Sequence, residues 1–220
     1  MTSCHPLETV GTAYHRINLR EGQNRLRVLV HDLASRIEPG MREDDARHLA
    51  NELILAAGFE RRWHPSLVRF GEATLCTFLQ PSRPDRVLQD DDIFFIDLGA
   101  VWKGQEADAG AAFAVGRDSE HHAIASAVQT LWHEVAALSA SGGFSGQQLY
   151  QAAQQLAHTK GYRLNLEIQG HRVSDYPHSA RGTPDLGTFP EQPRSDLWIL
   201  EIQIAHPQRP FGAFYEDLLT

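Results

Sequence analysis

Four carboxylate residues between positions 97 and 216 of this 220-residue chain lie within runs of apolar, strand-like sequence. They are Asp97 in FFIDLGAV, Asp108 in EADAGAAF, Glu201 in LWILEIQI and Glu216 in FGAFYEDLL. A charge in a buried strand is costly unless a counter-ion, hydrogen-bond donors or a metal compensates it. The chain must therefore fold so that each of these carboxylates meets a partner.

An imidazole extends this set, because His171 follows Gly170 at the end of an apolar segment. Four carboxylates and one imidazole are donors that a pair of divalent cations accepts, and two such ions side by side can support hydrolysis. Taken alone, Asp97 could be a strand-end carboxylate and Asp108 a loop carboxylate. For this pair, that interpretation is as good as a metal site. The other three residues favour a metal site.

The hydrophobic pattern predicts two helices, a group of strands, two more helices and a second group of strands. The expected helices span 14–37, 43–57, 120–138 and 145–160, and the expected strands span 63–70, 93–101, 110–115, 164–168, 198–204 and 211–218. Two similar halves of this kind predict a pseudo-symmetric α+β fold with helices outside a curved sheet. We expect one domain over residues 1–220, with residues 1–15 as a flexible N-terminal extension.

Composition narrows the class of protein. The formal net charge of −8 argues against nucleic acid as a partner, and no run approaches the ~20 apolar residues that a membrane span needs. Two cysteines and an N-terminus without a signal-peptide layout predict a cytoplasmic protein. The expected partner is a small-molecule or short-peptide substrate, and a homodimer is compatible with the sequence.

The order and contexts of these residues resemble the pita-bread metallopeptidase superfamily, which includes methionine aminopeptidases, aminopeptidase P, prolidases and creatinase. The resemblance runs from about residue 18 to the C-terminus and rests on Asp97-Leu98-Gly99, Asp108, Gly170-His171, His178, Glu201 and Glu216-Asp217. It implies the pita-bread fold, with two pseudo-symmetric halves and helices outside a curved antiparallel sheet. It also implies a metallohydrolase that cleaves an amide or related C–N bond with two divalent ions, Mn, Co, Fe or Zn.

The same resemblance assigns a role to each site residue. Asp97 is expected to chelate one ion, Asp108 and Glu216 to bridge both, and His171 to bind one. Glu201 is expected to contact a metal and to shuttle a proton for the attacking water. His178, seven residues after His171, matches a non-ligand histidine that hydrogen-bonds the scissile carbonyl or the oxyanion, and a surface-loop histidine is the alternative.

Part of the substrate machinery departs from the family pattern. Phe78 stands where many family peptidases have a histidine, and Ala112 stands where many have a threonine. We expect Phe78 and His64 at the substrate pocket, although simple packing is favoured for His64. For Glu106, a solvated hairpin carboxylate is favoured over a residue that supports the metal ligands. The departures predict weak or no activity on Met-Xaa and Xaa-Pro peptides and a smaller, partly apolar substrate.

Two other functions stay open at this point. One is a non-peptidase metalloenzyme of specialised metabolism that acts on a small amino-acid-like molecule. The other is a catalytically silent module that keeps the fold and binds a peptide or protein. The complete set of five ligand-type residues argues against the silent module.

Overall fold

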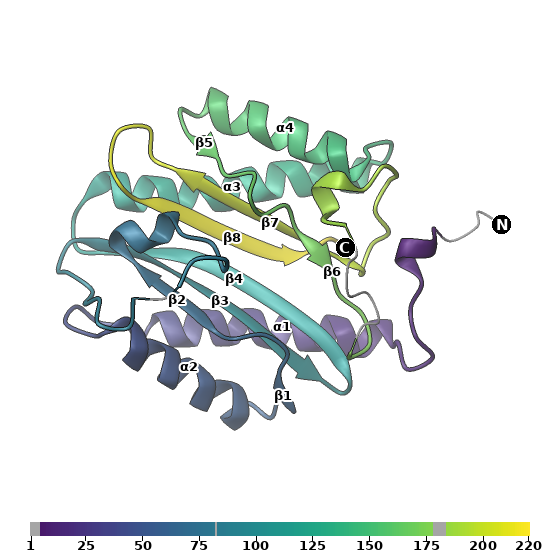
Figure 1. Ribbon diagram of the computed structural model, residues 1–220, viewed down its shortest axis with the longest axis horizontal. Helices are drawn as coiled ribbons and strands as arrows, with labels where there is room; N and C mark the ends of the chain where they lie inside the picture. The colour runs from purple at the N-terminus through teal and green to yellow at the C-terminus, as the bar shows by residue number, and fades with distance from the viewer. Residues whose placement is uncertain (1–4, 82, 178–183) are drawn as a thin grey trace.

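The computed structural model describes residues 5–81, 83–177 and 184–220 of the chain. A single antiparallel sheet runs through both halves, with helices α1 and α3 packed against it (Figure 1). The strands follow the order β1-β3-β4-β8-β7-β5, with β2 paired to β3 and β6 paired to β7. This arrangement confirms the expected α+β fold.

The first half supplies two helices and the β3–β4 hairpin. Its elements are α1 (Arg16–Ala34), α2 (Glu43–Ala56), β1 (Arg61–Arg62), β2 (Leu67–Phe70), β3 (Asp92–Trp102) and β4 (Gln105–Val115), with 3-10 turns η1 (Pro6–Glu8) and η2 (Gly71–Leu75). Lys103 and Gly104 both have positive φ, 46° and 72°, which suits a two-residue hairpin turn. A buried apolar cluster fills the space between α1, α2 and the strands β2 to β4.

The second half repeats this plan. Its elements are α3 (Ser119–Ser141), α4 (Gly146–Thr159), β5 (Arg163–Leu164), β6 (His171–Arg172), the 3-10 turn η3 (Leu186–Thr188), β7 (Trp198–Ala205) and β8 (Gly212–Leu218). Ser145 and Gln148 form the expected capping box at the start of α4. A second apolar cluster lies between α3, α4 and the β7–β8 hairpin. Each half therefore has its own core, and the two halves meet where β4 pairs with β8.

Several strand boundaries differ from the expected ones. The β4 strand begins at Gln105, five residues before the expected start, so Asp108 lies inside a strand and the alternative of a loop carboxylate is wrong. Its alanine-rich start has weak intrinsic strand preference, and pairing along the whole of β3 overrides it. The expected strand 164–168 is reduced to Arg163–Leu164, and β2 begins only at Leu67.

The N-terminal segment contacts the rest of the fold. Glu8 is buried, and its Oε1 accepts hydrogen bonds from Trp198 Nε1 at 2.7 Å and from the Arg194 backbone N–H at 2.7 Å. Arg172 donates to the backbone carbonyl of Thr9 at 3.4 Å. The division of the chain into one domain with a flexible extension stays a prediction.

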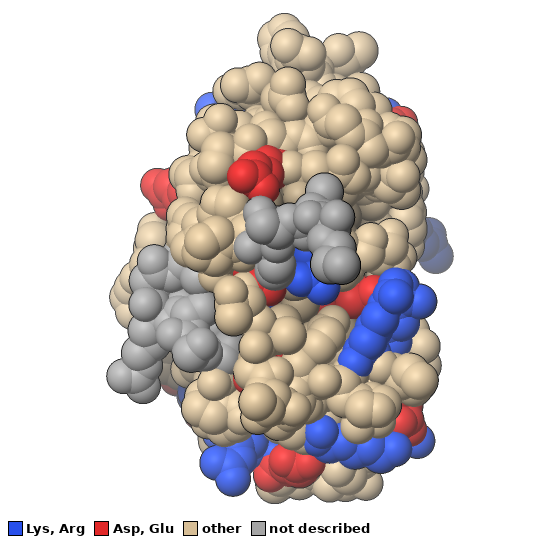
Figure 2. Space-filling model, turned by 90° about the vertical axis from the view of Figure 1, so that its right-hand side faces the viewer, with Lys and Arg blue, Asp and Glu red and all other residues tan. Residues whose placement is uncertain are grey.

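On the face shown in Figure 2, basic and acidic side chains lie next to each other along the lower margin, and most of the upper part carries no charge. Within the described ranges, no helix is both long and apolar enough to cross a bilayer.

Candidate metal centre

The sheet register places four carboxylates next to one another. Asp97 of β3 lies opposite Gly110 of β4, Gly110 lies opposite Glu216 of β8, and Glu216 lies opposite Glu201 of β7. Asp108 stands two residues before Gly110, on the same face of β4, because side chains alternate along a strand. Asp97 and Asp108 are therefore diagonal neighbours, and residues from both halves of the fold reach one site.

Gly110 leaves the centre of this row open. A Cβ atom at this position would lie 2.6 Å from the Phe214 ring and 2.9 Å from Glu216 Oε1. Real Cβ atoms do not approach other atoms so closely, so the neighbours would have to move. The missing side chain keeps a space between Asp97 and Glu216 into which both carboxylates can point.

His171 approaches the carboxylates from β6. Its Nε2 lies 2.9 Å from Asp108 Oδ2, and its Nδ1 lies 3.1 Å from the backbone carbonyl of Arg172. Gly170 has a φ of +70°, and a Cβ there would meet the Ile199 carbonyl at 2.3 Å. Its N–H donates to Glu201 Oε2 at 3.0 Å. The Gly-His pair thus needs glycine both for the backbone conformation and for the contact that orients Glu201.

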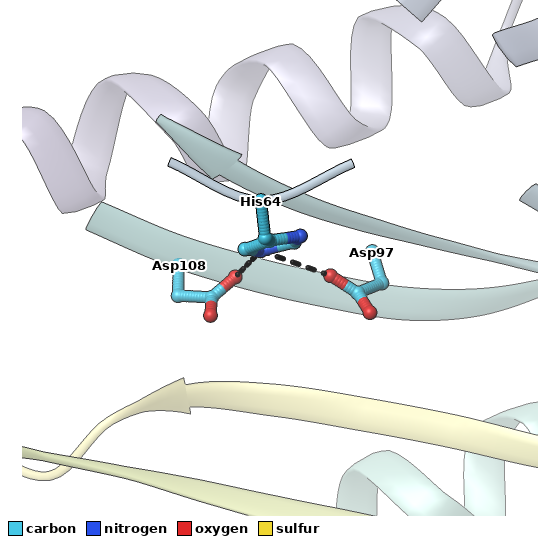
Figure 3. A group of neighbouring side chains, drawn as sticks. All are labelled: His64, Asp97 and Asp108. Atoms are coloured by element: carbon cyan, nitrogen blue, oxygen red, sulfur yellow. Dashed lines mark hydrogen bonds and ion pairs between the residues drawn. The ribbon is translucent and has the colours of Figure 1, made fainter. Parts of the chain in front are cut away.

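His64 also reaches the carboxylates, so the interpretation of this residue as simple packing is wrong. Its Nε2 lies 3.2 Å from Asp108 Oδ1 and 3.6 Å from Asp97 Oδ1, and Figure 3 shows the ring facing both carboxylates from the loop before β2. His178 lies outside the described residues, and its role stays a prediction.

The carboxylates of this site have little compensation from the protein. Within residues 5–81, 83–177 and 184–220, no Lys or Arg forms an ion pair with any of the four. Asp97 Oδ1 and both oxygens of Glu216 are buried without a hydrogen-bond partner among the described residues. Buried acceptors of this kind are rare in folded proteins and call for an ion or a proton.

The pKa values of the site show the cost of burying several carboxylates side by side. Burial raises the pKa of Asp97 to about 7, with the charges of Asp108 and Glu201 adding to the rise and His64 opposing it. Burial and the charges of Asp108 and Asp97 raise the pKa of Glu216 well above its usual value. Burial alone would lower the pKa of His64, but Asp108 and Asp97 outweigh it and raise that pKa to about 10. Without a cation, the site must hold protons to reduce the repulsion.

The donor atoms fit a pair of divalent cations. One group of candidate ligands is His64, Asp97 and Asp108, another is Asp108, His171 and Glu216, and the ligand atoms within each group lie within 4.8 Å of one another. Asp108 belongs to both groups, as a bridging carboxylate would. Oxygen and imidazole nitrogen donors accept several metals. The structure brings the five predicted ligand residues together, and their binding of metal stays a prediction.

Two supporting residues were not predicted from the sequence in these roles. Gln23 of α1 accepts from the Asp108 N–H at 3.0 Å and donates to Asp217 Oδ1 at 2.7 Å, and a buried glutamine on the apolar face of a helix is the signal that could have revealed it. Tyr150 of α4 donates to the Glu201 carbonyl at 2.7 Å. Glu106 is buried and accepts from the Ser174 N–H at 3.1 Å, so its expected solvation is wrong.

A cavity of about 460 Å³ opens onto the carboxylates. Its walls include Trp63, Ile168 and the exposed side chains of Phe78 and Leu79, together with Asp97, Asp108, His171 and Glu201. Behind Ile168, the aromatic rings of Phe95 and Phe214 form a small apolar cluster. Three of the four acids, Asp97, Asp108 and Glu201, thus line a cavity whose walls also include apolar side chains.

A profile of metallopeptidase family M24 matches residues 18–219. A curated methionine aminopeptidase from Clostridium acetobutylicum is 26% identical over 161 residues, which cover 68% of this chain and 62% of that protein. The chain therefore spans less than two thirds of that relative.

Solved structures share the fold at low sequence identity. An X-Pro aminopeptidase from Thermotoga maritima has a TM-score of 0.75 at 20% identity, with 91% of this chain and 56% of that one covered. A methionine aminopeptidase from the same organism has a TM-score of 0.72 at 16% identity, with 98% and 93% covered. These likenesses confirm the expected pita-bread fold.

Proposed function

The chain belongs to metallopeptidase family M24, and on that premise we propose that it is a metal-dependent hydrolase of an amide or related C–N bond. The observation that carries the proposal is the row of carboxylates from β3, β4, β8 and β7, buried without a Lys or Arg ion pair among the described residues. Such a row is unfavourable by itself and becomes favourable with cations bound.

The five residues Asp97, Asp108, His171, Glu201 and Glu216 would hold two divalent cations of the Mn, Co, Fe or Zn class. When bound, such ions polarise a carbonyl group and make water a better nucleophile at neutral pH. Glu201 would accept the proton of the attacking water, since it lines the cavity while its Oε2 is held by the Gly170 N–H at 3.0 Å. His178 would donate a hydrogen bond to the oxyanion.

The cavity walls support a small substrate with an apolar group. Phe78 and Ala112 cannot offer the hydrogen bonds that a histidine and a threonine would offer a peptide at these positions. Without those two hydrogen bonds, the contacts with Trp63, Phe78 and Ile168 would orient an extended peptide less well. We therefore propose an amino-acid-like amide, rather than an ordinary Met-Xaa or Xaa-Pro peptide, as the substrate.

Hydrolysis assays on chelator-treated and metal-restored protein test the proposal. The panel would pair short N-acyl or amide derivatives of apolar amino acids with Met-Ala and Ala-Pro dipeptides. We expect hydrolysis of some of the small amides, lost with chelator and restored by added cation. Rapid turnover of the dipeptides, with kcat/KM within about 10⁴–10⁸ M⁻¹s⁻¹, would instead indicate an ordinary aminopeptidase.

His178→Ala gives a second test of the same proposal. Loss of one oxyanion donor typically costs about 10²–10³ in kcat, and metal content should be unchanged. Loss of metal in this variant would make His178 a ligand, and full activity would remove it from the mechanism.

A further inference from the structure

We propose that His64 is a sixth protein ligand of the candidate metal centre, so that each of the two cation positions has one imidazole. The inference rests on the proposed function, because it assumes that the carboxylates hold cations. Its starting point is the placement of His64 directly over Asp97 and Asp108 (Figure 3).

His64 has the same surroundings as His171. The two imidazoles flank Asp108, with His171 Nε2 at 2.9 Å from Oδ2 and His64 Nε2 at 3.2 Å from Oδ1. In each residue, Nδ1 lies against the backbone carbonyl of the next residue, at 3.1 Å for His171 and 2.9 Å for His64. A carbonyl oxygen only accepts, so Nδ1 carries the hydrogen and Nε2 is the atom that can bind a metal.

The distances also suit two ligands of one ion. Zinc bonds of ~2.0–2.1 Å to nitrogen and oxygen place tetrahedral ligands about 3.3 Å apart. His64 Nε2 lies 3.2 Å from Asp108 Oδ1 and 3.6 Å from Asp97 Oδ1, on either side of that value. The 3.6 Å separation exceeds the ~3.2 Å limit of an ordinary hydrogen bond, so a hydrogen bond does not explain why His64 lies this close to Asp97.

The surrounding residues hold the ring in this position. A Cβ at Gly99, opposite Asp108 in the β3–β4 hairpin, would lie 2.0 Å from both Cδ2 and Nε2 of His64. The Trp63 ring stands nearly perpendicular to the imidazole, at 87° and 4.5 Å between centroids, and its Nε1 donates to the Ala107 carbonyl at 2.9 Å. Glycine on one side and a fixed indole on the other leave a slot that the imidazole fills.

A second imidazole changes the expected metal preference. Carboxylates alone suit Mg, Ca and Mn, whereas imidazole suits Zn, Fe, Ni and Cu. With His64 and His171 on separate ions, both positions should favour the second group. The alternative is a charged His64 that neutralises Asp97 and Asp108 in place of a cation.

X-ray absorption spectra of the zinc-loaded protein count imidazoles directly. Wild type should show two imidazoles for each pair of zinc ions, and His64→Ala should show one. The affinity of the more weakly bound ion should fall in this variant by more than the roughly 10–100-fold that loss of an outer-sphere partner costs. His48→Ala, an exposed histidine of α2, is the matched control and should change neither measurement.

Gly99→Ala is a second variant, which retains His64 but displaces its ring, and it should lose the same imidazole signal. One imidazole for each zinc pair in wild type, or unchanged affinity in His64→Ala, would overturn the inference while leaving the proposed function intact. A wild-type protein that binds no zinc and no other divalent cation would overturn both together.

Discussion

Two groups of buried carboxylates in this molecule are compensated in different ways. Asp196 is fully buried. Its carboxylate forms one ion pair with Arg20 Nε at 2.5 Å and a second one with Arg16. Glu216 and Asp97 are similarly buried, yet no Lys or Arg forms an ion pair with them among the described residues. The first group is complete as the protein folds, whereas the part of the chain that the structure describes gives the second no Lys or Arg partner.

The difference shows why burial alone does not identify a metal site. Asp217 is the immediate neighbour of Glu216, but it is held by Arg27 at 2.9 Å and by Gln23 at 2.7 Å. Asp217 faces α1, whereas Glu216 faces the row of carboxylates on the other side of β8. Alternation along one strand thus separates a structural acid from a candidate ligand.

Neutralising one acid from each group should give opposite results, and the largest effect is expected at the carboxylate row. In Glu216→Gln, catalysis and most of the metal-dependent stabilisation should be lost. For wild type, that stabilisation is about 4 kcal/mol at a thousandfold excess of cation over Kd. The metal-free variant should be at least as stable as metal-free wild type, because the amide is always neutral, whereas Glu216 must either carry a buried charge or take up a proton. Denaturation with and without cation measures both quantities.

Asp196→Asn is the matched change at the complete pair, and a smaller effect is expected. Charge-assisted hydrogen bonds are worth about 1.5–3 kcal/mol, and Arg16 and Arg20 are half exposed and can return to water. We expect a loss of about 2 kcal/mol with and without cation, and unchanged metal content. A stabilised Asp196→Asn protein, or a destabilised metal-free Glu216→Gln protein, would contradict the division into two groups.

The smallest effect is a pH dependence of the metal-free protein. The pKa of Asp97 is about 7 in the fold against 3.8 when unperturbed, so the folded state binds the extra proton between these values. This contribution to stability is present at low pH and is lost as the pH rises through about 7. We expect stability to fall from about pH 4 to about pH 7, by at most about 1.4 kcal/mol per pH unit for one proton.

Asp108 acts in the opposite direction at lower pH. Burial alone would raise its pKa, but His64 and His171 outweigh burial and lower it, so its contribution is lost only as the pH falls. Cation binding requires deprotonated ligands, so stability with saturating zinc should not decrease over the same range, from about pH 4 to about pH 7. Urea denaturation at several pH values checks the sign, and a metal-free protein that gains stability over this range would contradict the description of Asp97.

Much of this site could be predicted from the sequence, because its residues carry local signals. Asp97, Asp108, Glu201 and Glu216 are acids within apolar runs, and helix α2 begins at the predicted residue, Glu43. The row across four strands depends on register, which for the β4–β8 pair is a tertiary property. No local pattern shows that Gly110 stands between Asp97 and Glu216.

The sequence places His64 at the substrate pocket, which it lines, but its contact with Asp97 and Asp108 could not be predicted for a similar reason. It lies in a loop next to Pro65, in a stretch without strand or helix periodicity. Its approach to the acids depends on the space at Gly99 in strand β3. It also depends on the indole of Trp63, which is held by a hydrogen bond to the Ala107 carbonyl in β4. Side chains that long-range packing brings to a site leave little trace in a single sequence.

The central claim is that the carboxylate row holds two divalent cations, with Asp108 shared between them. Metal analysis and calorimetric titration of protein purified without chelator test it most directly. We expect two equivalents for each chain in wild type and at least one equivalent lost in Asp108→Ala. Fewer than two equivalents in wild type, or the same metal content in Asp108→Ala as in wild type, would contradict the account.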